Sequence, residues 1–345
     1  EARVYAEDSV RGFLPATGTV VLVEEPCGRP GVRVDSALAR GATVGIRYDP
    51  MLAKVVARGV TRTEALDRLR AALEQTAVLG VTTNVGYLTR LLAHPDVVAG
   101  RLDTGLVDRT LGELAGPDET DTRDAAVAAA CRLVAGLEPA GSAVDPWEVP
   151  DGWSIAGPRQ SSVALRLGGR TVSVTLRGRV REGATVHVDG GPALQVRAEP
   201  MDVASSVLSL TIDGTSASWQ TAFDREDIWV SRGGDSWRFA PGPGGRAERG
   251  TTAKSAGPVT SPMPGVVVAV HAVVGDVVRS GQTLVTVEAM KMEHAVVATE
   301  GGVVMEVLVR PGQSVGLDQL LARVEPVEPV GPGDPDGAGH AGGAD

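Results

Sequence analysis

The stretch TVEAMKMEHAVVATEGG, residues 286–302, places one lysine, Lys291, between Met290 and Met292 in a region made otherwise mostly of Val, Ala and Gly. Valine-rich runs bounded by glycines are typical of short β-strands joined by turns. We therefore predict a compact β-rich module over residues 258–326, and the lysine in its middle needs an explanation.

This module contains an internal repeat with a constant offset of 37 residues, since residues 265–267 (GVV) match residues 302–304. The same offset relates Gly275 to Gly312, Val278 to Val315, Gln282 to Gln319, and Leu284, Val287 and Glu288 to Leu321, Val324 and Glu325. Two β-rich copies predict a flattened barrel with pseudo-two-fold symmetry, whereas a solenoid would need more repeats. Lys291 lies at the seam between the halves, which predicts a hairpin turn at one end of the barrel.

A lysine at such a turn extends its four-carbon stem into solvent, where the amine stays hydrated and is a poor catalytic nucleophile. The amine is nevertheless accessible to another enzyme, so the position suits covalent attachment of a prosthetic group. Two interpretations compete: a solvated turn lysine, or an acylated lysine that carries a swinging group. The repeat and the flanking residues together favour the second interpretation.

Residues 288–294 (EAMKMEH) resemble the biotinylation motif of biotin carboxyl carrier domains, and residues 261–267 (SPMPGVV) resemble the start of that domain. The resemblance implies a flattened β-barrel biotinyl domain with biotin bound to Lys291 through an amide, attached by a biotin protein ligase. Ala289, Met290 and Met292 complete the implied cofactor-binding motif. The two methionines either offer a soft surface to the ligase and partners or pack in the core.

The first 115 residues mix strand and helix patterns. Strand-like runs precede a helix predicted over residues 61–80, with a capping box from Thr61 to Glu64 and a stop at Gly80. Segments of residues 1–95, among them RYDPMLAKVVARG, resemble the C-terminal part of biotin carboxylase, which has an ATP-grasp fold. The resemblance implies use of ATP, bicarbonate and Mg²⁺ or Mn²⁺.

The glycine-rich loop, metal-binding carboxylates and catalytic glutamate of that family precede the matched part. The chain, which does not begin with Met, is therefore expected to be N-terminally truncated and inactive alone in ATP-dependent carboxylation. Arg33, in GVRVDS, matches the family's arginine near bicarbonate and the biotin ring. A guanidinium fits that catalytic role because it holds an oxyanion with two donors. The alternative is a surface ion pair of Arg33 with Asp35 or Glu24.

The middle region opens with a helix predicted over residues 124–139, after a linker at 116–123. Short alternating runs separated by Gly-Gly and Asp-Gly turns then predict an antiparallel meander, with a small β-barrel beside the helix. The region resembles the helix-plus-barrel domain of acyl-CoA carboxylase alpha subunits, which implies docking of a carboxyltransferase beta subunit. Its tryptophans serve either as interface hot spots or as core residues: Trp147, Trp153, Trp219, Trp229 and Trp237.

The predicted fold class is α+β and multidomain. The predicted domains are the C-terminal part of biotin carboxylase at 1–115, a helix plus antiparallel β-barrel docking domain at 116–240, a flexible linker at 241–257, the biotinyl domain at 258–326 and a disordered tail at 327–345.

The composition argues against several classes of partner and indicates a cellular location. The net charge is −10 without a long basic run, which argues against nucleic-acid binding. No apolar stretch approaches the roughly 20 residues of a membrane span. Cys27 and Cys131 lie far apart, and no His or Cys has a partner at metal-ligand spacing, so we expect no metal site and a reducing, cytoplasmic location.

The combined resemblances identify the chain as the biotin-carrying portion of an acyl-CoA carboxylase alpha subunit. Biotin on Lys291 would be carboxylated with ATP and bicarbonate by the biotin carboxylase domain, in a hetero-oligomer. It would carry CO2 to a separate carboxyltransferase beta subunit acting on acetyl-, propionyl- or methylcrotonyl-CoA. About 145 residues separate the stretch that resembles biotin carboxylase, which ends near residue 95, from the linker, and these are too few for a carboxyltransferase barrel of ~250 residues. The alternatives are a lipoyl-type carrier and a non-catalytic assembly module.

Overall fold

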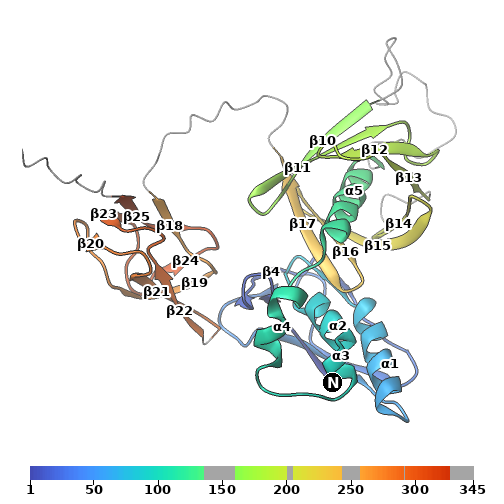
Figure 1. Cartoon of the computed structure of the whole chain (residues 1–345), viewed down its shortest axis with the longest axis horizontal. Coiled ribbons are helices and arrows are strands. Elements are labelled where there is room, and N and C mark those ends of the chain that lie inside the picture. The colour runs from blue at the N-terminus through green and yellow to red at the C-terminus, as the bar shows by residue number, and fades with distance from the viewer. Residues whose placement is uncertain (136–159, 200–204, 243–256, 291, 327–345) are drawn as a thin grey trace, which may run out of the picture. The chain divides into compact units, whose positions relative to one another are not determined.

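The computed structural model describes residues 1–135, 160–199, 205–242, 257–290 and 292–326. The chain divides into two compact units, residues 1–250 and residues 251–345. Figure 1 labels the elements of both units.

The N-terminal part of the first unit is built on a three-stranded antiparallel sheet in the order β1-β8-β6: β1 (Ala2–Tyr5), β8 (Met51–Ala57) and β6 (Val32–Ser36). Three short antiparallel pairs accompany it: β2 (Glu7–Asp8) with β3 (Leu14–Pro15), β4 (Gly18–Thr19) with β7 (Thr43–Val44), and β5 (Leu22–Glu24) with β9 (Ala77–Leu79). Apolar residues of β1 and β8 share a core with Leu69, Leu73 and Val85 of the helices.

Helix α1 (Arg62–Glu74) begins as the sequence predicts but ends earlier. The Thr61 hydroxyl accepts a hydrogen bond from the Glu64 amide at 3.2 Å, while the Glu64 carboxylate accepts from the Val60 amide at 2.6 Å. The prediction that the helix continues to Gly80 is wrong, because residues 77–79 form β9 and are buried against β5. Strand pairing and burial there outweigh local helix propensity.

Three further helices follow. α2 (Val85–Ala93) ends just before His94, and Pro95 begins the short helix α3 (Pro95–Val98). α4 (Leu106–Leu114) was not expected from the sequence.

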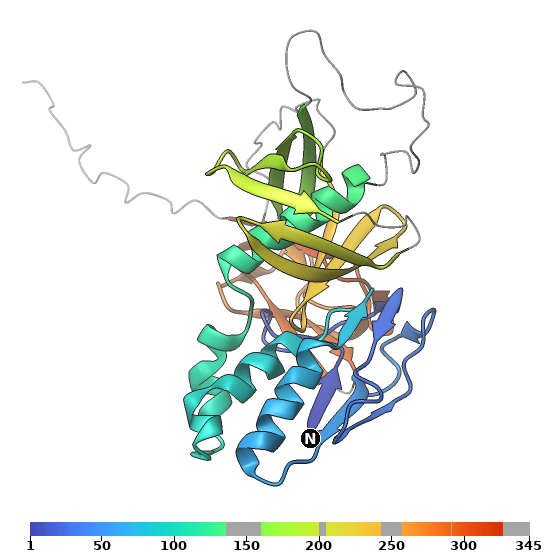
Figure 2. The same cartoon turned by 90° about the vertical axis from the view of Figure 1, so that its right-hand side faces the viewer.

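A closed eight-stranded antiparallel barrel forms the rest of the first unit, and α5 (Glu119–Ala135) packs inside it (Figure 2). The strands, in barrel order, are β10 (Gln160–Leu167), β11 (Arg170–Arg177), β12 (Ala184–Val188), β13 (Leu194–Ala198), β14 (Val207–Ile212), β15 (Thr215–Asp224), β16 (Asp227–Arg232) and β17 (Asp235–Pro241).

Two expectations about α5 are wrong. The helix begins five residues before position 124, inside the expected linker, and the Asp118 carboxylate accepts from the Asp121 amide at 2.7 Å at its start. The helix also lies within the barrel core and not beside it: residues 125–131 are all buried. Its run of alanines allows this position, because small side chains let the barrel strands approach the helix on every side.

The second unit contains two four-stranded sheets. One has the order β18 (Gly257–Thr260), β25 (Leu320–Pro326), β23 (Gly302–Val307), β20 (Val277–Val278). The other has the order β22 (Met292–Val297), β21 (Thr283–Ala289), β19 (Gly265–Val270), β24 (Ser314–Val315). The predicted flattened, two-fold barrel is confirmed.

The 37-residue repeat determines this architecture strand by strand. Val266 pairs with Glu288 in β19–β21, and the residues 37 positions later, Val303 and Glu325, pair in β23–β25, with a bulge at the same place in both ladders. The repeat also reaches further than the identical residues suggest, because the pairing of β18 with β25 reproduces the pairing of β22 with β21.

Candidate functional site

The hairpin of β21 and β22 is the candidate attachment site. Its antiparallel ladder runs without interruption from Val285↔Val296 to Ala289↔Met292, so residues 290–291 join the two strands. A two-residue connection is the tightest common hairpin loop, and it projects from the end of the sheet. Lys291 itself lies outside the residues that the structure describes.

The two methionines at the loop have different environments. Met290 is 5% exposed and Ala289 is 2% exposed, whereas Met292 is 46% exposed. Met290 also adopts a positive φ of 47°, a conformation that costs a non-glycine residue roughly 1–2 kcal/mol. Burial of its thioether side chain offsets that cost and anchors the loop. Met290 is thus a core residue, and only Met292 offers an apolar side chain at the surface.

Two glutamates precede and follow the loop. Glu288 and Glu293 are directly opposite each other in the ladder, and both are exposed. Like charges at opposed positions destabilise a hairpin modestly. Together with the exposed side chain of Met292, they give the surface next to the loop two negative charges and one apolar side chain. Such a surface suits a partner that offers positive charge and an apolar patch.

Arg33 lies on β6 in the first unit. It pairs with Val56 of β8, its side chain is 71% exposed, and its Nε lies 3.0 Å from Asp35 Oδ1. The surface ion pair considered from the sequence is therefore present with Asp35. An exposed pair of this kind contributes about 0–1 kcal/mol, so it leaves the guanidinium available to a stronger anion.

The repeated glycines and glutamines have structural roles that the sequence only hinted at. A Cβ atom at Gly265 would lie 2.5 Å from the Glu288 carbonyl oxygen, and one at Gly302 would overlap the Glu325 carbonyl oxygen. Gln282 Oε1 accepts from the Arg279 amide at 3.0 Å, and Gln319 Oε1 accepts from the Gly316 amide at 2.8 Å. In the sequence, the recurrence of these glycines and glutamines at the 37-residue offset is the signal that indicates a structural role.

Within the residues that the structure describes, no group of three or more His, Cys, Asp and Glu residues could hold a metal ion. None of the described helices is long and apolar enough to cross a membrane.

Comparison with known families divides the chain into three matched segments. Residues 1–109 match the family model of the biotin carboxylase C-terminal domain, and residues 122–243 match that of the methylcrotonyl-CoA carboxylase alpha-subunit BT domain. Residues 257–324 match the family model described as biotin-requiring enzyme.

Curated relatives match across these segments. The methylcrotonoyl-CoA carboxylase subunit alpha of Dictyostelium discoideum is 29% identical over 86% of this chain and 44% of its own length. The propionyl-CoA carboxylase alpha chain of Mus musculus is 33% identical over 94% of this chain and 46% of its own length, and that of Ruegeria pomeroyi is 29% identical over 94% and 51%. The chain therefore spans about half the length of the curated relatives it matches.

The three segments occur in the order expected from the sequence motifs, and the relatives that align across them are alpha subunits of acyl-CoA carboxylases. Over all three segments the chain is similar to the biotin-containing alpha subunits of acyl-CoA carboxylases.

Proposed function

We propose that this chain is the carrier portion of a biotin-dependent acyl-CoA carboxylase, with biotin attached to Lys291. The observation that supports it most strongly is the β21–β22 hairpin. Its two strands pair as far as Ala289 and Met292, so only two residues connect them at the end of the sheet. A buried Met290 holds the loop in place, so an attached group would extend from a fixed base.

Attachment of biotin, catalysed by a biotin protein ligase, would join its carboxyl carbon to the lysine nitrogen as an amide, while the carboxyl hydroxyl and a proton from the amine leave overall as water. The amide removes the charge of the amine and lengthens the arm beyond the loop. Biotin held in this way would supply a carrier for a carboxyl group. Ala289, Met290 and Met292 would form the base of the arm, and the exposed side chain of Met292 would meet the ligase.

Arg33 is proposed to hold an anion in the complete subunit, where ATP, bicarbonate and Mg²⁺ or Mn²⁺ would be used. Its side chain extends from the exposed face of β6, where Asp35 is its ion-pair partner. A guanidinium presents paired donors to a carbonate-type oxyanion and remains charged at any physiological pH.

The proposed reaction partner is a carboxyltransferase beta subunit that accepts the carboxyl group for acetyl-, propionyl- or methylcrotonyl-CoA. The barrel segment, residues 122–243, matches the alpha-subunit BT domain and is the proposed docking region for that subunit. The proposed domain boundaries are those predicted from the sequence, with a linker at 241–257 between barrel and carrier. The proposed location is cytoplasmic, because the chain has only Cys27 and Cys131, far apart in the sequence, and secreted domains are usually richer in cysteine.

The attachment site can be tested by mass spectrometry, because the chain has only three lysines that could be acylated: Lys54, Lys254 and Lys291. After coexpression with a biotin protein ligase, peptide mass spectrometry should find one biotin, on Lys291. Lys291→Arg should abolish the biotin signal completely, while Lys54→Arg should leave it unchanged. A lipoyl mass on Lys291, or biotin that persists in Lys291→Arg, would overturn the proposal.

A further inference from the structure

One strand of the barrel is buried on both of its faces. In β16, Ile228 and Val230 belong to the barrel core, yet Trp229 and Ser231 between and after them are only 4% and 3% exposed. β13 instead alternates buried and exposed residues, as expected for a barrel wall. Because successive side chains point to opposite faces, Trp229 points out of the barrel and must be covered from outside.

The element that covers this face comes from the carboxylase segment. β9 (Ala77–Leu79) contacts β15, β16 and β17, and all three of its residues are buried. Trp219 and Trp237, by contrast, belong to the barrel core, and Trp147 and Trp153 lie outside the described residues. Trp229 is therefore the tryptophan, among the three described, that packs between two matched domains.

The turn after β16 also fits against the carboxylase segment. Gly234 is buried and has a φ of +91°, and a Cβ atom there would lie 3.0 Å from Thr89 Oγ1 of α2 and 3.3 Å from the Leu73 carbonyl oxygen of α1. Both the backbone conformation and the space at this position favour glycine.

A second glycine faces the same turn from α2. A Cβ atom at Gly86 would overlap the Asp235 carboxylate. Glycine is unfavourable in a helix compared with alanine, so its presence in α2 indicates a packing requirement. The two surfaces are thus matched by one glycine on each side.

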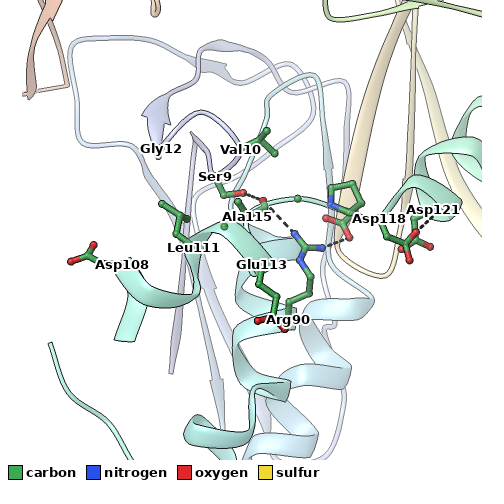
Figure 3. Close-up of a pocket in the computed structure, with 14 residues that line it drawn as sticks. Ser9, Val10, Gly12, Arg90, Asp108, Leu111, Glu113, Ala115, Asp118 and Asp121 are labelled. Atoms are coloured by element: carbon green, nitrogen blue, oxygen red, sulfur yellow. Dashed lines mark hydrogen bonds and ion pairs between the residues drawn. The ribbon is translucent and has the colours of Figure 1, made fainter. Parts of the chain in front are cut away.

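Arg90 links three elements at this place. Its Nη1 donates to Asp235 Oδ2 at 2.6 Å and its Nε donates to the Leu114 carbonyl at the end of α4 at 2.8 Å. Figure 3 shows Arg90 reaching toward the chain at Ala115, whose carbonyl also accepts from Ser9 Oγ at 2.5 Å. The side chains of Arg90 and Asp235 are 24% and 17% exposed, so the pair is largely shielded from solvent.

We propose that this surface is a permanent interdomain interface that holds residues 1–135, 160–199 and 205–242 together as one rigid body. The interface consists of Trp229, Gly234 and Asp235 on the barrel, and of β9, Gly86 and Arg90 on the carboxylase segment. The interface itself does not depend on biotin attachment.

A distance measurement in the whole chain tests this proposal. Cys27 is exposed and takes a spin label, Cys131 is buried, and Ser218→Cys adds a second label on the exposed face of the barrel. Double electron–electron resonance should give one narrow distance distribution for this pair. A broad or multiple distribution would show independent motion of the two segments and would overturn the proposal.

Variants locate the interface. Gly86→Leu, which inserts a side chain against Asp235, and Trp229→Ala, which empties the outer face of β16, should each broaden the distribution severalfold. The matched control is Gly112→Leu in α4, where a Cβ atom meets nothing within 4 Å. Its distribution should stay narrow. A narrow distribution in both Gly86→Leu and Trp229→Ala would contradict the assignment.

Two further readouts separate the possible failures. Circular dichroism should stay unchanged in both interface variants, because Gly86 and Trp229 lie outside the barrel core; loss of secondary structure in both would also contradict an interface between separately folded segments. Biotin on Lys291 should be the same in every variant, so absence of biotin would count against the proposed function and not against the interface.

Discussion

The carrier module and the carboxylase segment hold their candidate site residues in different ways. In the module, the candidate attachment position falls between two paired strands, and Met290 next to it is buried. In the carboxylase segment, Arg33 stands on an exposed strand face with Asp35 as its ion-pair partner. An attachment site is local because one hairpin defines it, whereas an anion site is assembled from groups on several elements.

The largest expected effect comes from breaking the module at its repeat. Gly302→Val should unfold the module, because the new side chain would overlap the Glu325 carbonyl of the neighbouring strand. Overpacking costs typically 1–3 kcal/mol and more where backbone is in the way. The matched control is Gly301→Ala, where a Cβ atom meets nothing nearer than 3.5 Å. Urea unfolding of both variants checks this, and equal stabilities would contradict it.

The second-largest effect is expected at Arg33, where a substitution should lower activity without lowering stability. In an alpha subunit that contains this chain, Arg33→Ala should lower bicarbonate-dependent carboxylation of biotin by about 10²–10³-fold, the usual loss when one oxyanion donor is removed. The free energy of unfolding should change by less than about 0.5 kcal/mol, since the side chain is exposed.

Asp35→Ala is the control for that experiment, because it removes the ion pair while keeping the guanidinium. It should leave the carboxylation rate close to that of the unchanged subunit. Equal losses in the two variants would mean that the ion pair, and not the arginine, matters.

A smaller effect tests the equivalence of the two halves of the module. Gln282→Ala and Gln319→Ala each remove a side-chain oxygen that accepts from a backbone amide. Each should lower the free energy of unfolding by about 1 kcal/mol, the usual net value of one hydrogen bond. Thermal unfolding of the two variants should give similar shifts, and a strong inequality would show that the halves have diverged in stability.

The smallest effect concerns how the free energy of unfolding changes with pH. Asp235 and Asp103, each paired with an arginine, should contribute to this change with opposite signs. Burial raises the pKa of the Asp235 carboxyl above its ordinary value, although Arg90 and Arg232 lower it and Asp121 adds to the rise. The folded chain therefore binds that proton more readily than the unfolded chain, so this group makes the protein more stable as pH falls toward the ordinary aspartate value near 3.8.

Asp103 is the matched case, because a hydrogen bond from Arg109 lowers the pKa of its carboxyl. Its stabilising contribution is present at neutral pH and is lost as pH falls through the lowered pKa. Urea unfolding at several pH values should show that Asp235→Asn and Asp103→Asn change the pH slope in opposite directions. Slopes of the same sign would refute this assignment of causes.

The module was the part best predicted from sequence, because its information is local. A 37-residue repeat and a Met-Lys-Met loop determine a hairpin and a two-fold barrel with little help from distant segments. The burial of Met290 and the exposure of Met292 could not be separated beforehand, since both methionines flank Lys291 in the same way.

The errors lie where distant segments meet. Residues 77–79 continue a helix pattern, yet they form β9 because β5 pairs with them and the barrel covers them. α5 looked like a helix beside a barrel because an alanine-rich pattern does not show that strands surround it. The packing of Gly86 against Asp235, and of Gly234 against Thr89 and Leu73, brings together segments about 150 residues apart in the sequence, so it is evident only in three dimensions.

The exchange of short strands in the module has a consequence for stoichiometry. β20 of the first half completes the sheet of the second, and β24 of the second completes that of the first. Reciprocal exchange between equivalent halves is the arrangement of a two-fold homodimer fused into one polypeptide. By the repeat offset, Lys291 corresponds to Lys254, which precedes β18, and to Glu328, which follows β25. Only Lys291 falls between two consecutive paired strands, β21 and β22, so the duplicated scaffold would offer one hairpin position for a swinging arm.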